Sequence, residues 1–387
     1  MLTAPPLGLY VHLPWCVSKC PYCDFNSHAL RGRLPESAYR DALLADLDEE
    51  LAAVPERTIS SIFFGGGTPS LFSPSTIGRL IESVESAGRL AESAEITLEA
   101  NPGTVEHASF ADLRAAGINR VSLGVQSFDA EQLSVLGRIH GPDEALRAIE
   151  EVHRAGIPRL NADLMFGLPG QTPEGALRDV EIALDAGVRH LSHYQLTLEP
   201  NTLFYSDPPE LPDDERIWAA LQRCQAALAG AGLEQYEVSA YAVPGQECVH
   251  NLNYWTFGDY LGVGAGAHGK LTYPAEDRIV RRSKKRHPAA YMPGPLRTEE
   301  SRLIDRPRRV FEFMLNALRL KQGFPESQFE ERTGVMQQSV QPGFDLAIER
   351  GLLESRAGTD WRPTDLGYRF LNDLQAIFLP LEGEERG

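Results

Sequence analysis

Three of the five cysteines in this 387-residue chain lie within eight residues of one another, at Cys16, Cys20 and Cys23. Thiolates this close on one loop can converge on a single metal centre, and cysteine thiolates are the ligands of iron–sulfur clusters. Three thiolates suit a four-iron cluster in which one iron stays open to a substrate or cofactor. A structural zinc ion usually takes four ligands, often from two C-x-x-C pairs. Because no second pair follows, zinc would need a distant fourth ligand such as His28, which remains the alternative.

A glycine run and several polar residues follow apolar segments further along the chain. Gly65, Gly66 and Gly67 precede Thr68, and glycines placed in this way expose backbone N–H and C=O groups that suit a small polar ligand. A tight turn between a strand and a helix would use the same run. Polar side chains also follow later apolar segments, and these are Glu99, Gln126, Asp163, His193 and Tyr194.

Short β-branched and aromatic segments alternate with amphipathic helical segments up to about residue 239, as is typical of a parallel sheet with crossover helices. We expect strands at 8–13, 59–64, 95–100, 120–125, 160–166 and 191–198, with a short seventh at 235–239. We expect helices at 36–54, 74–88, 105–116, 131–135, 143–155, 173–186 and 213–231. Six such units predict an α/β fold with a partial (β/α)6 TIM-like barrel, and a doubly wound sheet is the alternative.

The predicted barrel would gather these polar residues at one end. Functional groups of parallel α/β barrels collect at the carboxyl ends of the strands. The cysteine loop follows the first expected strand and the glycine run follows the second. Glu99, Gln126 and Asp163 lie at or near the ends of the next three. We therefore expect all of them to share one mouth.

Composition excludes several classes of protein. The formal net charge is −17 and the pI is about 5.1, whereas nucleic-acid binding relies on a basic surface. Five cysteines, three of them clustered, fit a reducing cytosol better than a disulfide framework. The N-terminus does not resemble a signal peptide, and no apolar run reaches the roughly 20 residues that span a bilayer. We expect a soluble cytoplasmic protein, and peripheral association with a membrane stays open.

A second unit follows the expected barrel. We expect a barrel core at 1–240, a connecting segment at 241–295, a small winged-helix-like α+β domain at 296–380 and a disordered tail at 381–387. The second unit should contain helices at 310–320, 325–333, 342–350 and 364–376 and a hairpin at 352–362. Winged helices often bind DNA, but the acidic balance of this unit favours contact with a protein or a role as a lid.

The spacing C-x3-C-x2-C, with Tyr22 before the last cysteine, resembles the cluster motif of the radical S-adenosylmethionine (SAM) superfamily. The resemblance implies a [4Fe–4S] cluster whose open iron binds the amino and carboxylate groups of SAM. It also implies that an electron from the cluster cleaves SAM to a 5′-deoxyadenosyl radical. Gly66, Gly67 and Thr68 would hydrogen-bond the amino group of SAM, and Arg138 would pair with its carboxylate. The residues implied for the SAM site are Tyr10, Tyr22, Gly66, Gly67, Thr68, Glu99, Gln126, Arg138 and Asp163.

Three longer segments narrow the resemblance, at 14–28 (PWCVSKCPYCDFNSH), 65–71 (GGGTPSL) and 250–255 (HNLNYW). They resemble the coproporphyrinogen-dehydrogenase-like branch and, within it, the HemW-type haem chaperones. The oxygen-independent dehydrogenase typically has another cysteine where this chain has Phe25, and it has a longer N-terminal extension. The resemblance therefore implies a haem chaperone without coproporphyrinogen dehydrogenase activity. Such a protein binds a [4Fe–4S] cluster, SAM and haem and transfers haem to an acceptor protein.

Two other functions remain as alternatives. One is a radical SAM oxidoreductase of the oxygen-independent coproporphyrinogen III dehydrogenase type, and the other is an iron–sulfur protein that binds no SAM. The H-N-x-x-Y-W segment is associated with haem in the HemW-type family, which nominates His250 as the axial ligand. Cys248 is a rival ligand, and a structural role for the segment in a connecting loop is the other interpretation. The basic run at 278–286 would form either a solvated strand or a site for haem propionates or a client protein.

Overall fold

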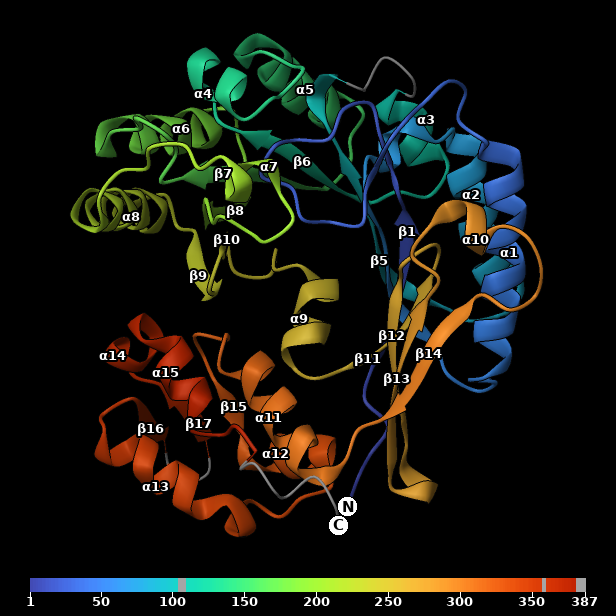
Figure 1. The fold of residues 1–387 in the computed structure, drawn as a ribbon, viewed down its shortest axis with the longest axis vertical. Coiled ribbons are helices and arrows are strands. Elements are labelled where there is room, and N and C mark those ends of the chain that lie inside the picture. The colour runs from blue at the N-terminus through green and yellow to red at the C-terminus, as the bar shows by residue number, and fades with distance from the viewer. Residues whose placement is uncertain (104–108, 357–359, 381–387) are drawn as a thin grey trace.

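The computed structural model describes residues 1–103, 109–356 and 360–380. Within these ranges the main element is a twelve-stranded sheet, shown in Figure 1. Six of its strands are parallel and hydrogen-bond to one another in chain order. These are β1 (Leu7–Leu13), β4 (Ile59–Gly66), β5 (Leu90–Ala100), β6 (Arg120–Gln126), β7 (Arg159–Phe166) and β8 (His190–Gln195).

Helices connect these strands and cover the outer side of the sheet, as Figure 1 shows. They are α1 (Glu36–Ala52), α2 (Pro74–Ser86), α3 (Phe110–Ala115), α4 (Ala130–Val135), α5 (Pro142–Arg154), α6 (Pro173–Asp185) and α8 (Asp214–Gly230). Side-chain caps begin several of them, because Ser73, Thr172 and Asp213 each accept the N–H three residues further on. Part of the helix expected at 105–116 lies outside the described residues.

The strand order distinguishes between the two predicted architectures. A doubly wound sheet reverses its order at a switch point, whereas these six strands run on without reversal. Right-handed crossovers between strands in such an order place all the connecting helices on one side. The predicted α/β fold with a partial barrel is therefore confirmed, and the doubly wound alternative is wrong.

The sheet extends beyond the six parallel strands on both sides. β10 (Ala240–Ala242) pairs with β8 and with β9 (Glu234–Glu237) on one side. β11 (Asp259–Val263) pairs in parallel with β1 on the other. Antiparallel strands then follow it, namely β12 (His268–Tyr273), β13 (Arg278–Lys284) and β14 (Thr298–Leu303). The segment expected only to connect two units thus contributes strands to the main sheet, while the division of the chain at residues 240 and 295 stays a prediction.

The basic run lies mostly in β13, and it is not simply solvated. Lys284 is buried, with its Nζ 2.5 Å from Asp46 Oδ1 and 2.7 Å from Glu50 Oε1 on α1. Arg281 pairs with Glu312 at 2.8 Å. The expectation of a solvated strand is wrong for Lys284, because its side chain ties the edge of the sheet to α1.

The C-terminal unit has a core of its own, which includes Phe313, Phe329, Phe344 and Trp361. Its helices are α11 (Arg306–Ala317), α12 (Glu326–Thr333), α13 (Gln341–Glu349), α14 (Asp365–Arg369) and α15 (Leu371–Ala376). A small antiparallel sheet contains β15 (Phe324–Pro325), β16 (Leu353–Arg356) and β17 (Asp360–Pro363). The helix expected at 364–376 is thus divided at Phe370, and the expected disordered tail lies outside the described residues. No helix in the described ranges is long and apolar enough to cross a membrane.

Candidate functional site

The cysteine loop begins where β1 ends, at the carboxyl edge of the parallel strands. Two short parallel strands, β2 (Trp15–Cys16) and β3 (His28–Ala29), pair and hold the two ends of the loop together. Cys16, Cys20 and Cys23 are all half-buried free thiols. Local pairing therefore places the three thiols on one compact loop beside the strand ends.

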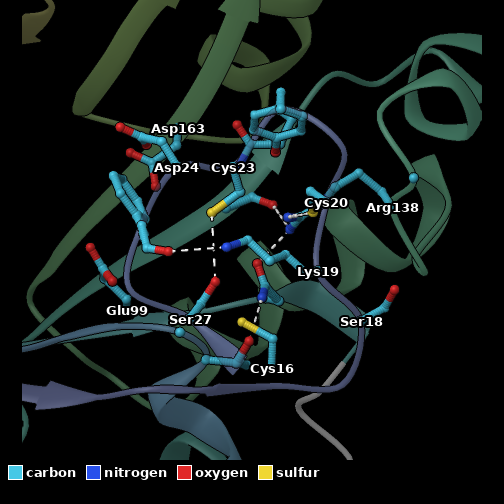
Figure 2. A pocket seen from close by; sticks show the side chains of 18 of the residues that line it. Cys16, Ser18, Lys19, Cys20, Cys23, Asp24, Ser27, Glu99, Arg138 and Asp163 are labelled. Atoms are coloured by element: carbon cyan, nitrogen blue, oxygen red, sulfur yellow. Dashed lines mark hydrogen bonds between the residues drawn. The ribbon is translucent and has the colours of Figure 1, made fainter. Parts of the chain in front are cut away.

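A cavity of about 330 Å³ lies against this loop. Figure 2 shows Glu99 and Asp163 on one side of the cysteines and Arg138 on the other. The predicted residues that line it are Cys16, Cys20, Cys23, Tyr22, Gly66, Gly67, Thr68, Glu99, Gln126, Arg138 and Asp163. Tyr10 and His250 instead line a second cavity of about 240 Å³, which shares Glu99 and Asp163 with the first. The structure thus brings the predicted cluster and SAM residues together around one cavity, apart from Tyr10, which lies with His250 at the adjoining cavity.

The arrangement of the thiols suits a cluster better than a zinc ion. Among the described residues, no three His, Cys, Asp or Glu side chains are placed to hold a single metal ion. In a four-iron cluster each thiolate binds a different iron, so three thiols spread around one cavity suit a cluster. Burial raises the pKa of Cys16 and of Cys23. A bound metal centre offsets the cost of ionising these buried thiols, because it stabilises the thiolate form of its ligands.

The glycine run braces the cysteine loop through backbone hydrogen bonds. The Gly67 N–H donates to the Leu13 carbonyl at 2.8 Å, and the Thr68 N–H donates to the Trp15 carbonyl at 2.8 Å. A Cβ on Gly67 would lie 2.5 Å from the Trp15 carbonyl oxygen, so the close approach requires glycine. The amino group of SAM would need oxygen acceptors rather than these N–H groups. Its binding by Gly66, Gly67 and Thr68 stays a prediction.

Arg138 reaches the cysteine loop from the segment after α4. Its guanidinium donates to Cys20 Sγ at 3.5 Å, to the Gly124 carbonyl at 2.7 Å and to the Asn101 side-chain oxygen. Burial lowers the pKa of Arg138, but Tyr22 and Cys20 beside it outweigh burial and raise that pKa, so the side chain stays charged. Arg138 therefore positions the middle cysteine of the loop. Its pairing with the SAM carboxylate stays a prediction.

Two carboxyl groups lie side by side in the floor of the cavity. Burial, and then the charge of Asp163, raise the pKa of Glu99 to about 7, although the Gly66 N–H donates to Glu99 at 3.1 Å. Burial also raises the pKa of Asp163, which accepts from Asn161 Nδ2 at 2.8 Å and from Ser122 Oγ at 3.3 Å. Near neutral pH the Glu99 carboxyl group can therefore gain or lose a proton.

Gln126 adopts a φ of +70°, a backbone conformation that residues other than glycine seldom take. The Tyr194 hydroxyl donates to Gln126 Oε1 at 2.6 Å and holds the side chain at the cavity. Strained residues of this kind gather at functional sites. The sequence predicts Tyr194 at the barrel mouth but no contact with SAM for it or for Asn101, which lines the cavity and donates from Nδ2 to Thr68 Oγ1 at 3.1 Å. Their only signal was a position just after a strand or near its end.

His250 lies in α9 (Val249–Trp255), which Figure 1 shows between the barrel and the C-terminal unit. The side chain is buried, with Nδ1 2.9 Å from Ser61 Oγ and Nε2 3.2 Å from the Tyr254 hydroxyl. Its ring stacks on Phe63 at a centroid distance of 5.0 Å. An axial ligand needs a nitrogen lone pair that faces room for a porphyrin, and this arrangement does not provide one. Haem ligation by His250 stays a prediction that the arrangement does not support.

The rival ligand, Cys248, is also buried. Its Sγ lies 3.4 Å from Glu95 Oε1, and burial raises the pKa of Cys248 to about 12. Glu95 also accepts the N–H groups of Val249 and His250 at 3.2 and 3.1 Å and pairs with Arg159 at 3.1 Å. The start of the H-N-x-x-Y-W helix is thus anchored on a buried carboxylate, and no sequence pattern indicates this role for Glu95.

Comparison with known proteins agrees with this site. Residues 10–183 match the model of the Radical SAM superfamily, and residues 304–370 match that of the HemN C-terminal domain. The chain is 50% identical over 379 residues to the heme chaperone HemW of Escherichia coli (strain K12), and the matched region covers 98% of this chain and 100% of that protein. It is 47% identical over 384 residues to the heme chaperone HemW of Haemophilus influenzae, which covers 98% of this chain and 99% of the relative.

A solved structure shows the same fold. The structure of coproporphyrinogen III oxidase (HemN) from Escherichia coli matches with a TM-score of 0.80 at 21% identity, over 97% of this chain and 90% of that one. At this identity the likeness concerns the fold alone. The curated relatives are far more similar and match along almost their entire length. The chain therefore belongs to the HemW heme chaperone family within the radical SAM superfamily.

Proposed function

We propose that this protein is a haem chaperone that binds a [4Fe–4S] cluster, SAM and haem and passes haem to an acceptor protein. The observation that carries the proposal is one cavity that joins three half-buried thiols to polar strand ends, in a chain 50% identical to a protein named heme chaperone HemW. Cys16, Cys20 and Cys23 would hold the cluster. When bound, the cluster would supply one electron to SAM.

The residues around the cluster loop would bind the parts of SAM according to their charge. The Glu99 and Asp163 carboxyl oxygens can accept hydrogen bonds from ribose hydroxyls or from the amino group. The Gln126 amide can both donate and accept. Arg138, already beside Cys20, would bring a positive charge to the carboxylate. Tyr22 lines the same cavity. Tyr10 lines the adjoining cavity, which shares Glu99, and would affect SAM only through that residue.

A chaperone is favoured over a tetrapyrrole-processing enzyme. Fold likeness to coproporphyrinogen III oxidase does not transfer its activity, because one fold supports many functions. Phe25 lines the mouth of the cavity and is 60% exposed, where the dehydrogenase typically carries a further cysteine. The mouth of the site therefore differs in chemistry from that of the enzyme.

Incubation with coproporphyrinogen III, SAM and a reductant separates the two functions. Cluster-loaded protein should leave the coproporphyrinogen unchanged in mass spectrometry and should bind added haem. The Cys20→Ala variant, which removes one thiolate, controls for chemistry by adventitious iron. Formation of protoporphyrinogen IX by the wild-type protein and not by Cys20→Ala would favour the oxidoreductase.

The acceptor is proposed to be a protein rather than a nucleic acid. A net charge of −17 repels phosphates, and the C-terminal helices carry exposed or half-buried acidic side chains such as Glu326, Glu330 and Asp345. We assign protein contact to this small winged-helix-like unit, following the division of the chain expected at residue 295. A truncation after residue 303, which keeps β14 in the main sheet, should then keep the cluster and lose the acceptor interaction.

A further inference from the structure

Five basic side chains lie on or next to the cysteine loop, in a chain whose formal net charge is −17. Three belong to the loop and the segment after it, and two come directly after β13. These five residues, which we call the basic face, are Lys19, Arg31, Arg33, Lys285 and Arg286. Lys285 is half-buried and the others are exposed. None of them forms an ion pair with a residue that the structure describes, whereas Arg281 and Lys284 in β13 both pair with carboxylates.

Hydrogen bonds hold the cysteine loop against the segment after β13. Lys19 Nζ donates to the Phe25 carbonyl at 3.3 Å. The next residue, Asn26, donates from Nδ2 to the Arg286 carbonyl at 2.9 Å. Burial, and then the charges around it, lower the pKa of His28, and Lys19 and Arg286 are two of those charges. The two cations therefore lie on either side of one histidine.

The same histidine connects them to the two arginines that follow the loop. The rings of His28 and His287 meet at a centroid distance of 5.2 Å. Both histidines line a surface cavity together with Arg31 and Arg33. The basic face is therefore one continuous surface, and the loop that carries the three cluster cysteines forms part of it.

Acidic side chains are scarce in the two segments that form this surface. Residues 15–35 include three basic side chains and one acidic side chain, Asp24, and residues 279–298 include no acidic side chain at all. Glu36, the next carboxylate along the chain, accepts hydrogen bonds from the Ser73 and Thr76 hydroxyls. A positive surface on an otherwise acidic protein attracts an acidic partner to this one place, because the rest of the molecule repels it.

Exposed apolar side chains lie beside these charges. Val17 and Phe25 are 46% and 60% exposed, and both line the mouth of the cluster cavity. Protein interfaces commonly combine an apolar centre with a polar rim, and the interfaces of weak redox complexes are small. The composition of this surface therefore suits brief contact with another protein.

The proposed cluster chemistry needs an electron from outside the chain. A bound cluster would give one electron to SAM, so one electron must then return to it. The two remaining cysteines, Cys224 and Cys248, are both buried. Among the described residues outside the cysteine loop, no group of side chains could hold a second metal centre. The electron must therefore come from another molecule, and the basic face lies on the loop that such a molecule has to approach.

We propose that the basic face docks an acidic one-electron carrier protein that reduces the cluster. One electron leaves the reduced carrier and enters the oxidised cluster, so the carrier is oxidised by one electron and the cluster is reduced by one. No bond forms or breaks, and no proton is transferred. The inference rests on the proposed cluster and adds the class of partner that supplies its electron.

The test follows cluster reduction in the full-length, cluster-loaded protein by stopped-flow absorbance, with an acidic flavodoxin in its hydroquinone state as the carrier. Arg31→Glu/Arg33→Glu/Arg286→Glu should lower the second-order rate constant about ten- to a hundredfold at low ionic strength, because the steering charge is reversed. Added salt should slow the wild-type reaction steeply and the variant much less. The affinity for the oxidised carrier, measured by isothermal titration, should fall as well.

Arg79→Glu/Arg178→Glu/Arg189→Glu is the matched control. These three arginines are exposed, and none forms an ion pair with a residue in the described ranges. Each of the three exchanges replaces a positive by a negative charge, so both triple variants carry a net charge of −23 in place of −17. The control should keep a rate constant close to that of the wild type, because a general change in net charge leaves the basic face intact.

An uncharged photoreductant, deazariboflavin under light, should reduce the cluster equally well in all three proteins. Equal rate constants of the two triple variants with the carrier would overturn the proposed docking. Slower haem transfer in Arg31→Glu/Arg33→Glu/Arg286→Glu, with unchanged reduction by the carrier, would assign the basic face to the haem acceptor and would also overturn it. Failure of the photoreductant to reduce the wild-type protein would instead contradict the proposed cluster itself.

Discussion

Glu99 is the residue through which pH should act on SAM binding. Burial and the charge of Asp163 raise the pKa of Glu99 to about 7, so its carboxyl group is largely neutral below that pH and largely ionised above it. An amino group or a ribose hydroxyl is held better by the ionised form, because a carboxylate accepts more strongly. SAM affinity should therefore rise as pH increases from about 6 to about 8. Isothermal titration across this range measures it.

The Glu99→Gln variant is the control for this pH dependence. Glutamine keeps an oxygen that can accept from the Gly66 N–H but cannot ionise. Its SAM affinity should be lower and nearly independent of pH in the same window. A slope as steep as that of the wild type would assign the titration to another group, such as Asp163.

The three loop cysteines should be individually essential for the cluster. Anaerobic reconstitution of the wild-type protein should give close to four irons per chain, as a cluster of that type requires. Cys16→Ala, Cys20→Ala and Cys23→Ala should each lose it. Cys224→Ala is the matched control, because Cys224 is buried in α8. Iron analysis and EPR measure the result, and a full cluster in Cys20→Ala would contradict the assignment.

At the scale of single residues, the sequence predicts most of the residues that line the cavity, whereas the haem ligand stays a prediction. Residues that directly follow or end strands, such as Glu99 and Gln126, are placed by topology alone, so their convergence is predictable. His250 was nominated by its motif, and no pattern in the sequence shows that both of its ring nitrogens meet hydroxyl groups.

Among the elements, α9 depends on one buried carboxylate. Glu95 on β5 accepts the N–H groups of Val249 and His250 and pairs with Arg159, and it lies 3.8 Å from Arg120. Glu95→Ala would leave the buried Arg120 without its counter-ion, which typically costs about 3–5 kcal/mol of unfolding free energy. Urea unfolding monitored by circular dichroism measures the loss.

Glu92→Ala is the matched control for this prediction. Glu92 lies three residues earlier on the same strand and is exposed, so its removal should change the unfolding free energy by less than about 0.5 kcal/mol. Equal stabilities of Glu95→Ala and Glu92→Ala would show that α9 is held by packing rather than by this anchor.

Strand β11 shows why some elements could not be predicted. Its sequence, DYLGV, contains Gly262 and leads directly into Gly264 and Gly266, and glycine weakens a strand and breaks the alternation of apolar and polar residues. A Cβ on Gly262 would lie 1.9 Å from the His268 carbonyl oxygen, so glycine is required by the close approach of the next strand. The residue that argued against a strand is therefore a consequence of how tightly that strand packs.

Across the whole molecule, Asp259 joins several parts of the chain. It pairs with Arg57 at 2.6 Å and Lys270 at 2.8 Å, and it accepts the Thr272 N–H at 2.9 Å. Lys270 also lies 4.3 Å above the ring of Phe257, which belongs to the C-terminal core. Asp259→Asn would leave the buried Lys270 without a carboxylate, at a cost of about 3–5 kcal/mol at neutral pH. Urea unfolding at pH 7, 5 and 3 measures it.

The pH dependence of this loss has a definite sign. Burial acts to raise the pKa of Asp259, but Lys270 and Arg57 outweigh it, so the pKa is lowered below its ordinary value of 3.8. The stabilisation is therefore present above about pH 3.8 and is lost as pH falls through the folded-state pKa. The gap between wild type and Asp259→Asn should narrow at pH 3. Asp373→Asn, at an exposed position, is the control and should match the stability of the wild type at every pH. A stability difference between wild type and Asp259→Asn that stays the same at pH 3 would contradict titration of the Asp259 carboxylate as its cause.

The central claim is that this molecule carries haem, and a haem titration of the cluster-loaded, full-length protein tests it most directly. Gel filtration removes unbound haem, and the pyridine haemochrome assay then counts haem per chain. We predict saturation at one haem per chain and recovery of the haem unchanged. Haem that elutes free of the protein, or that binds without saturating, would contradict the account.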